Sequence, residues 1–230
     1  MRPSSPSKTH PKAILLNGMA FHVLKYLESQ EGVRDLEMIT KDGVHDHDIA
    51  AWERKNIPYK MSPDLRGFFS MFNGLFVKWS CAVGDAVIPV GEIRVNSMES
   101  FIRIPIDGRF VTSELAQAQV SPPDPHTCAA FLLDSFCEYG QIIAVFRPSA
   151  VSEDVPEPEV WFQDLSARWH FISHTFKQYM RVMVLHLGII GWQMAYTADG
   201  LPLSTQQWMR VYCKERLCVD LHNQISLTVN

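Results

Sequence analysis

MSPDLRGFFSMFNGLFVKWS, from Met61 to Ser80, decides the fold class because it encodes a capped helix, a turn and a strand without interruption. Ser62 is a suitable N-cap, and Pro63 follows at a position where a helix has no use for the backbone N–H. Asp64 places negative charge at the positive end of the helix dipole. Apolar residues then recur at helical spacing, namely Leu65, Phe68, Phe69 and Phe72.

The pattern changes after Asn73-Gly74, a pair that tolerates positive φ and can end a helix or reverse the chain. Leu75, Val77 and Trp79 would then share one face of a strand, because side chains alternate between the two faces. The segment therefore predicts a helix packed on a sheet.

In the flanking sequence, apolar residues also recur at helical spacing in some segments and at strand spacing in others. Pro89 indicates an edge strand or a bend, since proline cannot donate to a strand ladder. The predicted elements are a helix from Ala13, a strand from Val33 to Thr40, a helix from Asp48 to Lys55, strands at Val87 to Val90 and Gly91 to Ser97, a hairpin of Ala129 to Phe136 with Gln141 to Phe146, and a strand at Val160 to Phe162.

Two helices are predicted in the last third of the chain. The longer one would be capped by Asp164 or Ser166 and would keep one apolar face as far as Leu187. The last, from about Ser204 to Glu215, would bury Trp208, Val211 and Tyr212. The whole order predicts an α+β fold, a mainly antiparallel sheet with helices packed against it and a long C-terminal helix.

The domain organisation predicted is simple. Residues 1–12 are rich in Pro, Ser and Lys and are expected to be a flexible N-terminal segment. Residues 13–230 would form a single domain with a loop insertion near 103–127, where Pro122-Pro123-Asp124-Pro125 excludes regular structure.

Composition argues against several classes of partner. The chain has 230 residues, 47% of them hydrophobic, and a net charge of -4, which does not favour nucleic-acid binding. The longest apolar run, Val182 to Ile190, is too short to span a membrane and is interrupted by His186 and Gly188. The basic residues near the N-terminus are not followed by the apolar stretch of a secretory signal, so no such signal is expected. We expect a soluble intracellular protein.

The cysteines do not form a recognisable pattern. An odd number of them in a chain of this length favours reduced thiols over a disulfide framework, and their spacing does not match a zinc site. They are Cys81, Cys128, Cys137, Cys213 and Cys218.

Two histidine-containing motifs are candidate metal sites. His170 and His174 would share a helix face, but Phe171 stands where a zinc protease carries its glutamate, so a structural role is favoured. The stretch His45-Asp46-His47-Asp48 is better explained as a solvated loop that caps the next helix. No nucleophile elbow and no glycine-rich phosphate loop is present. We expect no catalytic residue, no cofactor and no metal.

The tryptophans are the remaining conspicuous feature. Trp79, Trp161 and Trp169 fall on apolar faces of predicted elements and are expected in the core. Trp192 and Tyr196 follow the predicted long helix and are the candidate partner-interface residues.

Four segments carry a family resemblance. They are IAAWERKN at Ile49, the segment at Met61, VIPVGEIRVNSM at Val87, and the stretch from Glu159 to Pro202 that contains HLG and WQMA. Together they resemble the tubulin polyglutamylase complex subunit 2 family, within the SUKH superfamily of cell-wall-regulator and toxin-immunity domains. The helix, Asn-Gly and strand-Trp unit is shared widely, whereas the C-terminal stretch is specific to the narrower family.

The resemblance implies a non-catalytic scaffold or regulatory subunit. Its partners would be the other polyglutamylase complex subunits, including a tubulin-ligase-like catalytic subunit, with tubulin contacted indirectly. It also implies a location on microtubules in the cytoplasm, at the centrosome or basal body, or in the cilium. The alternatives are a structural microtubule or axoneme protein without a ligase partner, an immunity-type binding protein, and an enzyme with an unrecognised metal site.

Overall fold

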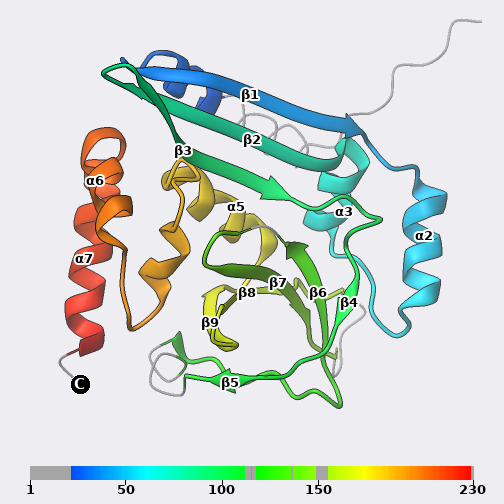
Figure 1. Ribbon diagram of the computed structural model, residues 1–230. Coiled ribbons are helices and arrows are strands. Elements are labelled where there is room, and N and C mark those ends of the chain that lie inside the picture. Colours follow the sequence, from blue (N-terminus) through cyan, green and yellow to red (C-terminus); the bar gives the residue numbers. More distant parts are fainter. Residues whose placement is uncertain (1–21, 112–114, 116–117, 136, 149–154, 229–230) are drawn as a thin grey trace, which may run out of the picture.

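The computed structural model describes residues 22–111, 115, 118–135, 137–148 and 155–228, with backbone alone for 225–228. The predicted flexible segment 1–12 and the start of the helix predicted from Ala13 lie outside these residues, although residues 22–28 are helical. The fold is α+β, as predicted: a three-stranded sheet lies over a curled six-stranded sheet, with helices between and beside them (Figure 1).

The elements follow one another along the chain in an order that separates the two sheets. The three-stranded sheet is complete before the six-stranded one begins. The elements are β1 (Val33–Asp42), α2 (Asp46–Lys55), α3 (Pro63–Met71), β2 (Phe72–Val83), β3 (Ala86–Val95), β4 (Arg103–Ile104), β5 (Arg109–Phe110), β6 (Ala129–Asp134), β7 (Gly140–Phe146), β8 (Glu159–Asp164), β9 (Arg168–Ser173), α5 (Phe176–Leu185), η1 (Trp192–Tyr196), α6 (Leu203–Tyr212) and α7 (Lys214–Thr228).

The helix and the strand predicted within Met61 to Ser80 both form, but the predicted turn between them does not, because β2 begins at Phe72 directly after α3. Ser62 caps α3, its Oγ accepting a hydrogen bond from the Leu65 N–H at 3.4 Å. The chain then passes directly into β2, whose inner residues Leu75, Val77 and Trp79 are buried. Asn73 does not reverse the chain. Its side-chain oxygen instead accepts a hydrogen bond from the Met98 N–H at 2.8 Å, which fixes the segment after β3.

The first sheet has the order β1-β2-β3 and is antiparallel throughout. Pro89 lies in β3, an edge strand, next to a register shift between Trp79 and Ser80. The edge position and the irregularity accommodate a residue that has no N–H, as expected.

The second sheet has the order β4-β6-β7-β8-β9-β5 and contains the predicted hairpin as β6 and β7. All its pairs are antiparallel except β5 with β9. Both outer strands come from the segment predicted as a loop insertion near 103–127. The first part of that segment, residues 103–110, therefore supplies both edge strands of the sheet.

The predicted long helix between Asp164 and Leu187 is wrong. The chain makes a turn after β8, in which Ala167 has a φ of 58°, returns as β9, and only then forms α5 from Phe176. In β9 the residues Trp169 and His170 are buried on opposite faces. Trp169, Ile172 and Phe176 are spaced as on one helix face, although Trp169 and Ile172 in fact lie on opposite faces of the strand.

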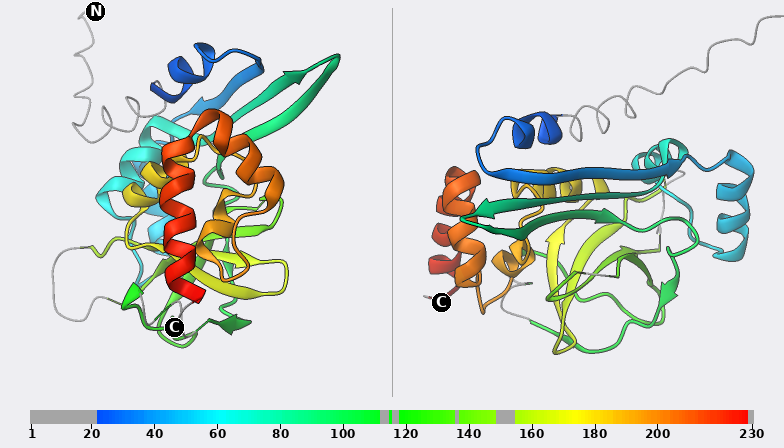
Figure 2. Two further views of the ribbon diagram at one scale, coloured as in Figure 1. Left: turned by 90° about the vertical axis from the view of Figure 1, so that its left-hand side faces the viewer. Right: turned by 45° about the horizontal axis from the view of Figure 1, so that its top comes forward.

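The C-terminus also differs from expectation. The last predicted helix is α6, which buries Met209 and Tyr212 but leaves the Val211 side chain 66% exposed. A further helix, α7, follows at once. Figure 2 shows α6 and α7 together at the end of the molecule opposite α2.

Two hydrophobic clusters lie on the two faces of the six-stranded sheet. The larger joins both sheets, with Trp52 packed against Phe101, Phe131 and Phe146 at ring distances of 5.6, 4.9 and 6.0 Å. The smaller contains Trp161 and Trp169 and is covered by residues of the predicted insertion, namely Ile104, Ile106, Phe110, Leu115 and Val120. The predicted burial of Trp79, Trp161 and Trp169 is confirmed. None of the helices among the described residues has the length and apolar character needed to cross a bilayer.

Candidate functional site

The candidate interface residues Trp192 and Tyr196 both lie in η1, between α5 and α6. The Trp192 side chain is 1% exposed and stacks on His186 with ring centroids 4.7 Å apart. Tyr196 is partly buried and meets the Trp192 ring edge-on at 6.1 Å. The Trp192 ring therefore packs inside the chain, and the predicted partner interface at Trp192 and Tyr196 stays a prediction.

The turn that leads into η1 depends on Gly191. Its φ is 85°, in the left-handed region that favours glycine. A Cβ there would also lie 2.6 Å from the Thr205 Oγ1, which donates a hydrogen bond to the Ile190 carbonyl at 2.7 Å. This close contact holds η1 against the start of α6.

A buried ionic group joins α5 to α7 behind Trp192. The His186 Nε2 lies 2.9 Å from the Asp220 Oδ2, and the His186 Nδ1 lies 2.7 Å from the Val182 carbonyl oxygen. Arg216 donates from its Nη2 to the second oxygen of Asp220. His186 and Asp220 are 0% and 1% exposed. The ion pair between Arg216 and Asp220 fixes the docking of α7, since separating the two side chains would leave the buried Asp220 carboxylate without a counter-charge.

Tyr196 lies beside this ionic group. Burial raises the pKa of its hydroxyl to about 12, with Arg216 opposing the rise and Asp220 adding to it. The Tyr196 hydroxyl is therefore a proton donor over the physiological range. It has no role as a general base there.

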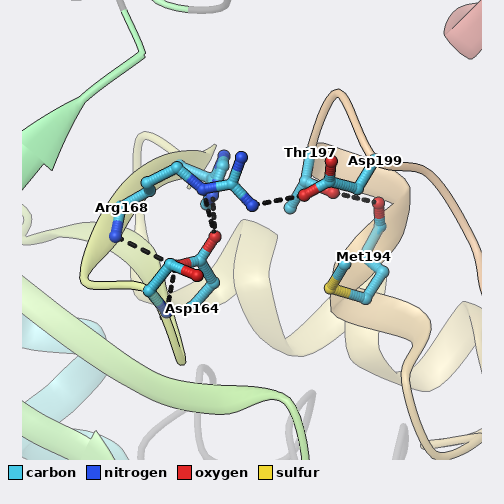
Figure 3. Close-up of polar contacts among 7 residues, drawn as sticks. Asp164, Arg168, Met194, Thr197 and Asp199 are labelled. Carbon is cyan, nitrogen blue, oxygen red and sulfur yellow. Dashed lines mark hydrogen bonds and ion pairs between the residues drawn. The ribbon is translucent and has the colours of Figure 1, made fainter.

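A second ionic group links the β8–β9 turn to the segment after η1 (Figure 3). The Asp164 Oδ1 accepts hydrogen bonds from the backbone N–H groups of Ser166 and Arg168 at 2.8 and 2.9 Å. The Asp164 Oδ2 accepts one from the Arg168 Nε at 2.7 Å and lies 3.2 Å from the His170 Nε2. Arg168 also donates to the carboxylate of Asp199, so one arginine bridges the two segments.

The pKa of Asp164 reflects these contacts. Burial alone would raise it, but the hydrogen bonds from Arg168, His170 and Ser166 outweigh burial and hold the pKa below its usual value. Asp164 is therefore a structural carboxylate that stays ionised, and not a proton donor.

The structure separates the two histidines of one predicted motif and brings together those of the other. His170 lies in β9 and is buried against Asp164, while His174 follows the strand and is exposed, so the shared helix face does not exist. His45 precedes α2 without making a side-chain capping hydrogen bond, and its ring stacks on His47 at 5.5 Å. Across the described ranges, no three His, Cys, Asp or Glu side chains are placed to hold a metal ion.

The five cysteines are all free and do not cluster. Burial raises the pKa of Cys137 and of Cys213 to about 12 in each case, with smaller effects from nearby charged side chains. Thiols with such a pKa are protonated and poor nucleophiles at neutral pH. The Cys81 sulfur accepts a hydrogen bond from Tyr212 at 3.0 Å, which ties β2 to α6.

The sequence did not reveal these ionic groups, although part of the signal was there. Arg216 and Asp220 stand four residues apart, the spacing of an ion pair on one helix face. Their partner His186 lies 34 residues away from Asp220, and no local pattern connects them.

Comparison with known proteins gives a consistent relationship. The chain is 30% identical over 224 residues to the human protein "Tubulin polyglutamylase complex subunit 2", an alignment that covers 90% of this chain and 71% of the human one. The rat and mouse proteins of the same name are also 30% identical, each with 72% of its length covered. No protein-family model matches the chain, and no solved structure matches it significantly. With this identity and coverage, the chain belongs to the tubulin polyglutamylase complex subunit 2 family.

Proposed function

We propose that the chain is a non-catalytic scaffold subunit of a tubulin polyglutamylase complex that helps to assemble or position a tubulin-ligase-like catalytic subunit on microtubules. The observation that carries this proposal is the similarity to relatives named as complex subunits, which extends over 90% of the chain. Because the alignment covers 90% of the chain, the likeness concerns most of the fold and not one short motif.

The buried His and Asp side chains support the same proposal, because they hold elements of the fold together. His170, His186, Asp164 and Asp220 are buried and fasten one element to another. Groups of this kind serve catalysis only when a substrate can reach them. Their positions favour a rigid binding platform, and we expect it to act through its surface.

Family membership also supports two finer proposals. We place the domain in the SUKH superfamily on the basis of its helix, Asn-Gly and strand-Trp unit, which forms α3 and β2 here. We further propose that the protein resides with the complex in the cytoplasm on microtubules, at the centrosome or basal body, or in the cilium. Fluorescence microscopy of the tagged chain together with a glutamylated-tubulin marker would test the location.

Affinity purification tests the assembly. The tagged full chain, expressed in ciliated cells and purified under mild conditions, should recover the other polyglutamylase complex subunits, including the ligase-like protein. The tag alone is the control. Recovery of none of these subunits by a well-folded chain would contradict the proposal.

Co-sedimentation separates the scaffold from a structural microtubule protein. The purified chain alone should remain in the supernatant with bare microtubules, and it should enter the pellet when the other subunits are added. Stoichiometric sedimentation without them would favour the structural alternative. Glutamylation of tubulin by the isolated chain, given ATP and glutamate, would show that it is an enzyme.

A further inference from the structure

β1 is an edge strand of ten residues whose outer side has no strand partner among the described residues (Figure 1). Such an edge presents unpaired N–H and C=O groups, and natural proteins usually block it. The register shift between Arg34 and Glu37, where Asp35 has a φ of 51°, adds a residue to β1 and disturbs only its start. The shift between Thr40 and Asp42 adds its residue to β2. From Glu37 to Asp42, β1 is therefore a regular strand with an open edge.

The direction of the backbone groups along this edge follows from the pairing with β2. The Ala82 N–H donates to a carbonyl just before β1 at 2.8 Å, so the even-numbered residues of β2 direct their backbone groups at β1. Phe76 is one of them, and Ile39 lies opposite it. The backbone groups of Ile39 are therefore used within the sheet. Those of its neighbours Met38 and Thr40 point outward, where they make no hydrogen bond to another described residue.

The exposed face of the same stretch is complementary to itself. The Ile39 side chain is 53% exposed and lies between Glu37 and Lys41, which share its face because side chains alternate along a strand. In an antiparallel pair of β1 strands with Ile39 opposite Ile39, each Glu37 lies opposite Lys41 of the second copy. Met38 and Thr40 then also lie opposite each other, so each such pair can exchange two backbone hydrogen bonds.

Both charged side chains can make this contact. The Glu37 carboxylate lies 3.0 Å from the Lys78 Nζ through one of its two oxygens, and both side chains are about half exposed. Lys41 forms no ion pair with a described residue and only attracts Glu99 at longer range, which contributes to the lowered pKa of that carboxyl. Exposed ion pairs stabilise little by themselves, but opposite charges that face each other across two strands favour one register over the others.

Apolar contacts would support the same register. Ile39 lies opposite Phe76 on β2, and the Arg94 guanidinium covers the Phe76 ring at 4.2 Å. Two strands joined at Ile39 would place both isoleucines between the two phenylalanines, in one row across the sheet. The exposed part of each Ile39 side chain would be removed from water, which favours association.

We propose that two copies of this chain associate through their β1 edges, in antiparallel register with Ile39 at the two-fold axis. The three-stranded sheets of the two copies would then form one continuous sheet. Because the same edge is used on both copies, the contact closes as a dimer and does not continue into a filament. The inference does not rest on the function proposed above, since it concerns the chain by itself.

Analytical ultracentrifugation of the isolated full-length chain tests the association. The average mass should rise from that of one chain toward that of two as the concentration increases to about 0.1 mM, where a Kd in the same range already populates the dimer. Thr40→Pro removes one outward N–H and none of the bonds to β2, so it should keep the mass at one chain. A wild-type chain that stays monomeric would overturn the second copy as the occupant of this edge and would leave the edge to a strand of another protein.

Reversing the charges tests the register. Glu37→Lys and Lys41→Glu each place like charges opposite each other twice in a dimer, so each variant alone should associate about tenfold more weakly than the wild type. In an equal mixture of the two variants, every such pair again joins a lysine to a glutamate. The mixed dimer should therefore form with nearly the wild-type affinity, which also shows that both variants are folded.

The control for these variants is Asp85→Lys, an equal change of charge at the exposed β2–β3 turn, which should dimerise like the wild type. A mixture that associates no better than either variant alone would contradict the proposed register. Wild-type dimers that neither charge reversal nor Thr40→Pro weakens would place the interface elsewhere on the chain and overturn the proposal.

Discussion

At the scale of single residues, Gly91 shows how one missing side chain fixes the packing between strands. It is paired with Trp79 across β2 and β3, and a Cβ added to it would lie 2.0 Å from the Trp79 Nε1. That nitrogen donates a hydrogen bond to the Leu187 carbonyl at 2.9 Å. The glycine therefore lets β3 approach the indole, and the indole in turn holds the end of α5.

Gly91→Ala tests this contact. The added methyl group must displace the Trp79 ring, and we expect the free energy of unfolding to fall by about 1–3 kcal/mol in urea denaturation. Gly67→Ala is a matched control, since a Cβ there meets no atom within 4 Å and alanine favours the α3 helix. The control should raise the stability by up to about 1 kcal/mol. Equal effects of the two substitutions would contradict the packing described.

The ionisation of Asp164 makes the free energy of unfolding depend on pH. Its pKa is lower in the folded chain than in the unfolded one, because hydrogen bonds to the carboxylate outweigh its burial. The stabilisation is therefore complete above the unfolded pKa of about 4 and is lost as the pH falls through the lower, folded value.

The variant Asp164→Asn measures this contribution. Its urea midpoint should lie below that of the wild type at pH 7, and the difference should shrink as the pH is lowered below about 4. Asp85→Asn, a change in an exposed turn, should leave the whole pH profile unaltered. A difference for Asp164→Asn that is independent of pH would exclude ionisation as its cause.

At the scale of elements, α7 is held to the rest of the chain by its buried polar contacts. Leu217 is buried, but Cys218 and Val219 face solvent, and the Asp220 carboxylate carries the contact with His186. Among the described side chains of α7, residues 214–224, this ionic group is therefore the main polar contact that anchors the helix.

Asp220→Ala should detach α7. The substitution leaves the Arg216 guanidinium without its counter-charge and His186 without its carboxylate partner, and breaking a buried pair of this kind costs about 3–5 kcal/mol. Hydrogen exchange of the α7 amides should become faster by a large factor, whereas β6 and β7 should keep their protection. Glu215→Ala, at an exposed position on the same helix, is the control. Unchanged protection of α7 in Asp220→Ala would contradict the anchoring role.

At the scale of the whole molecule, charge limits the direct partners. The net charge is -4. A negatively charged chain repels acidic tubulin tails, and this repulsion is strongest at low ionic strength.

The salt dependence of microtubule binding checks this reasoning. The isolated chain should show no sedimentation with microtubules at low salt, the condition that strengthens any electrostatic attraction. Assembled with the other subunits, it should sediment in a salt-sensitive manner. Salt-sensitive binding by the isolated chain would instead indicate a local basic surface on it.

The sequence alone determined the elements whose signals are local. Ser62, Pro63 and the alternation from Leu75 to Trp79 act within one helix turn or one strand, so α3, β2 and the β6–β7 hairpin could be predicted. The interval from Asp164 to Leu187 could not, because the apolar residues of β9 and of α5 together keep a helical spacing.

Only the tertiary structure decided which side chains are buried together. Trp192 was a reasonable surface residue in the sequence, yet it packs on His186, which binds Asp220 on another helix. Burial and electrostatic pairing depend on partners far away along the chain, and a local pattern carries no information about them.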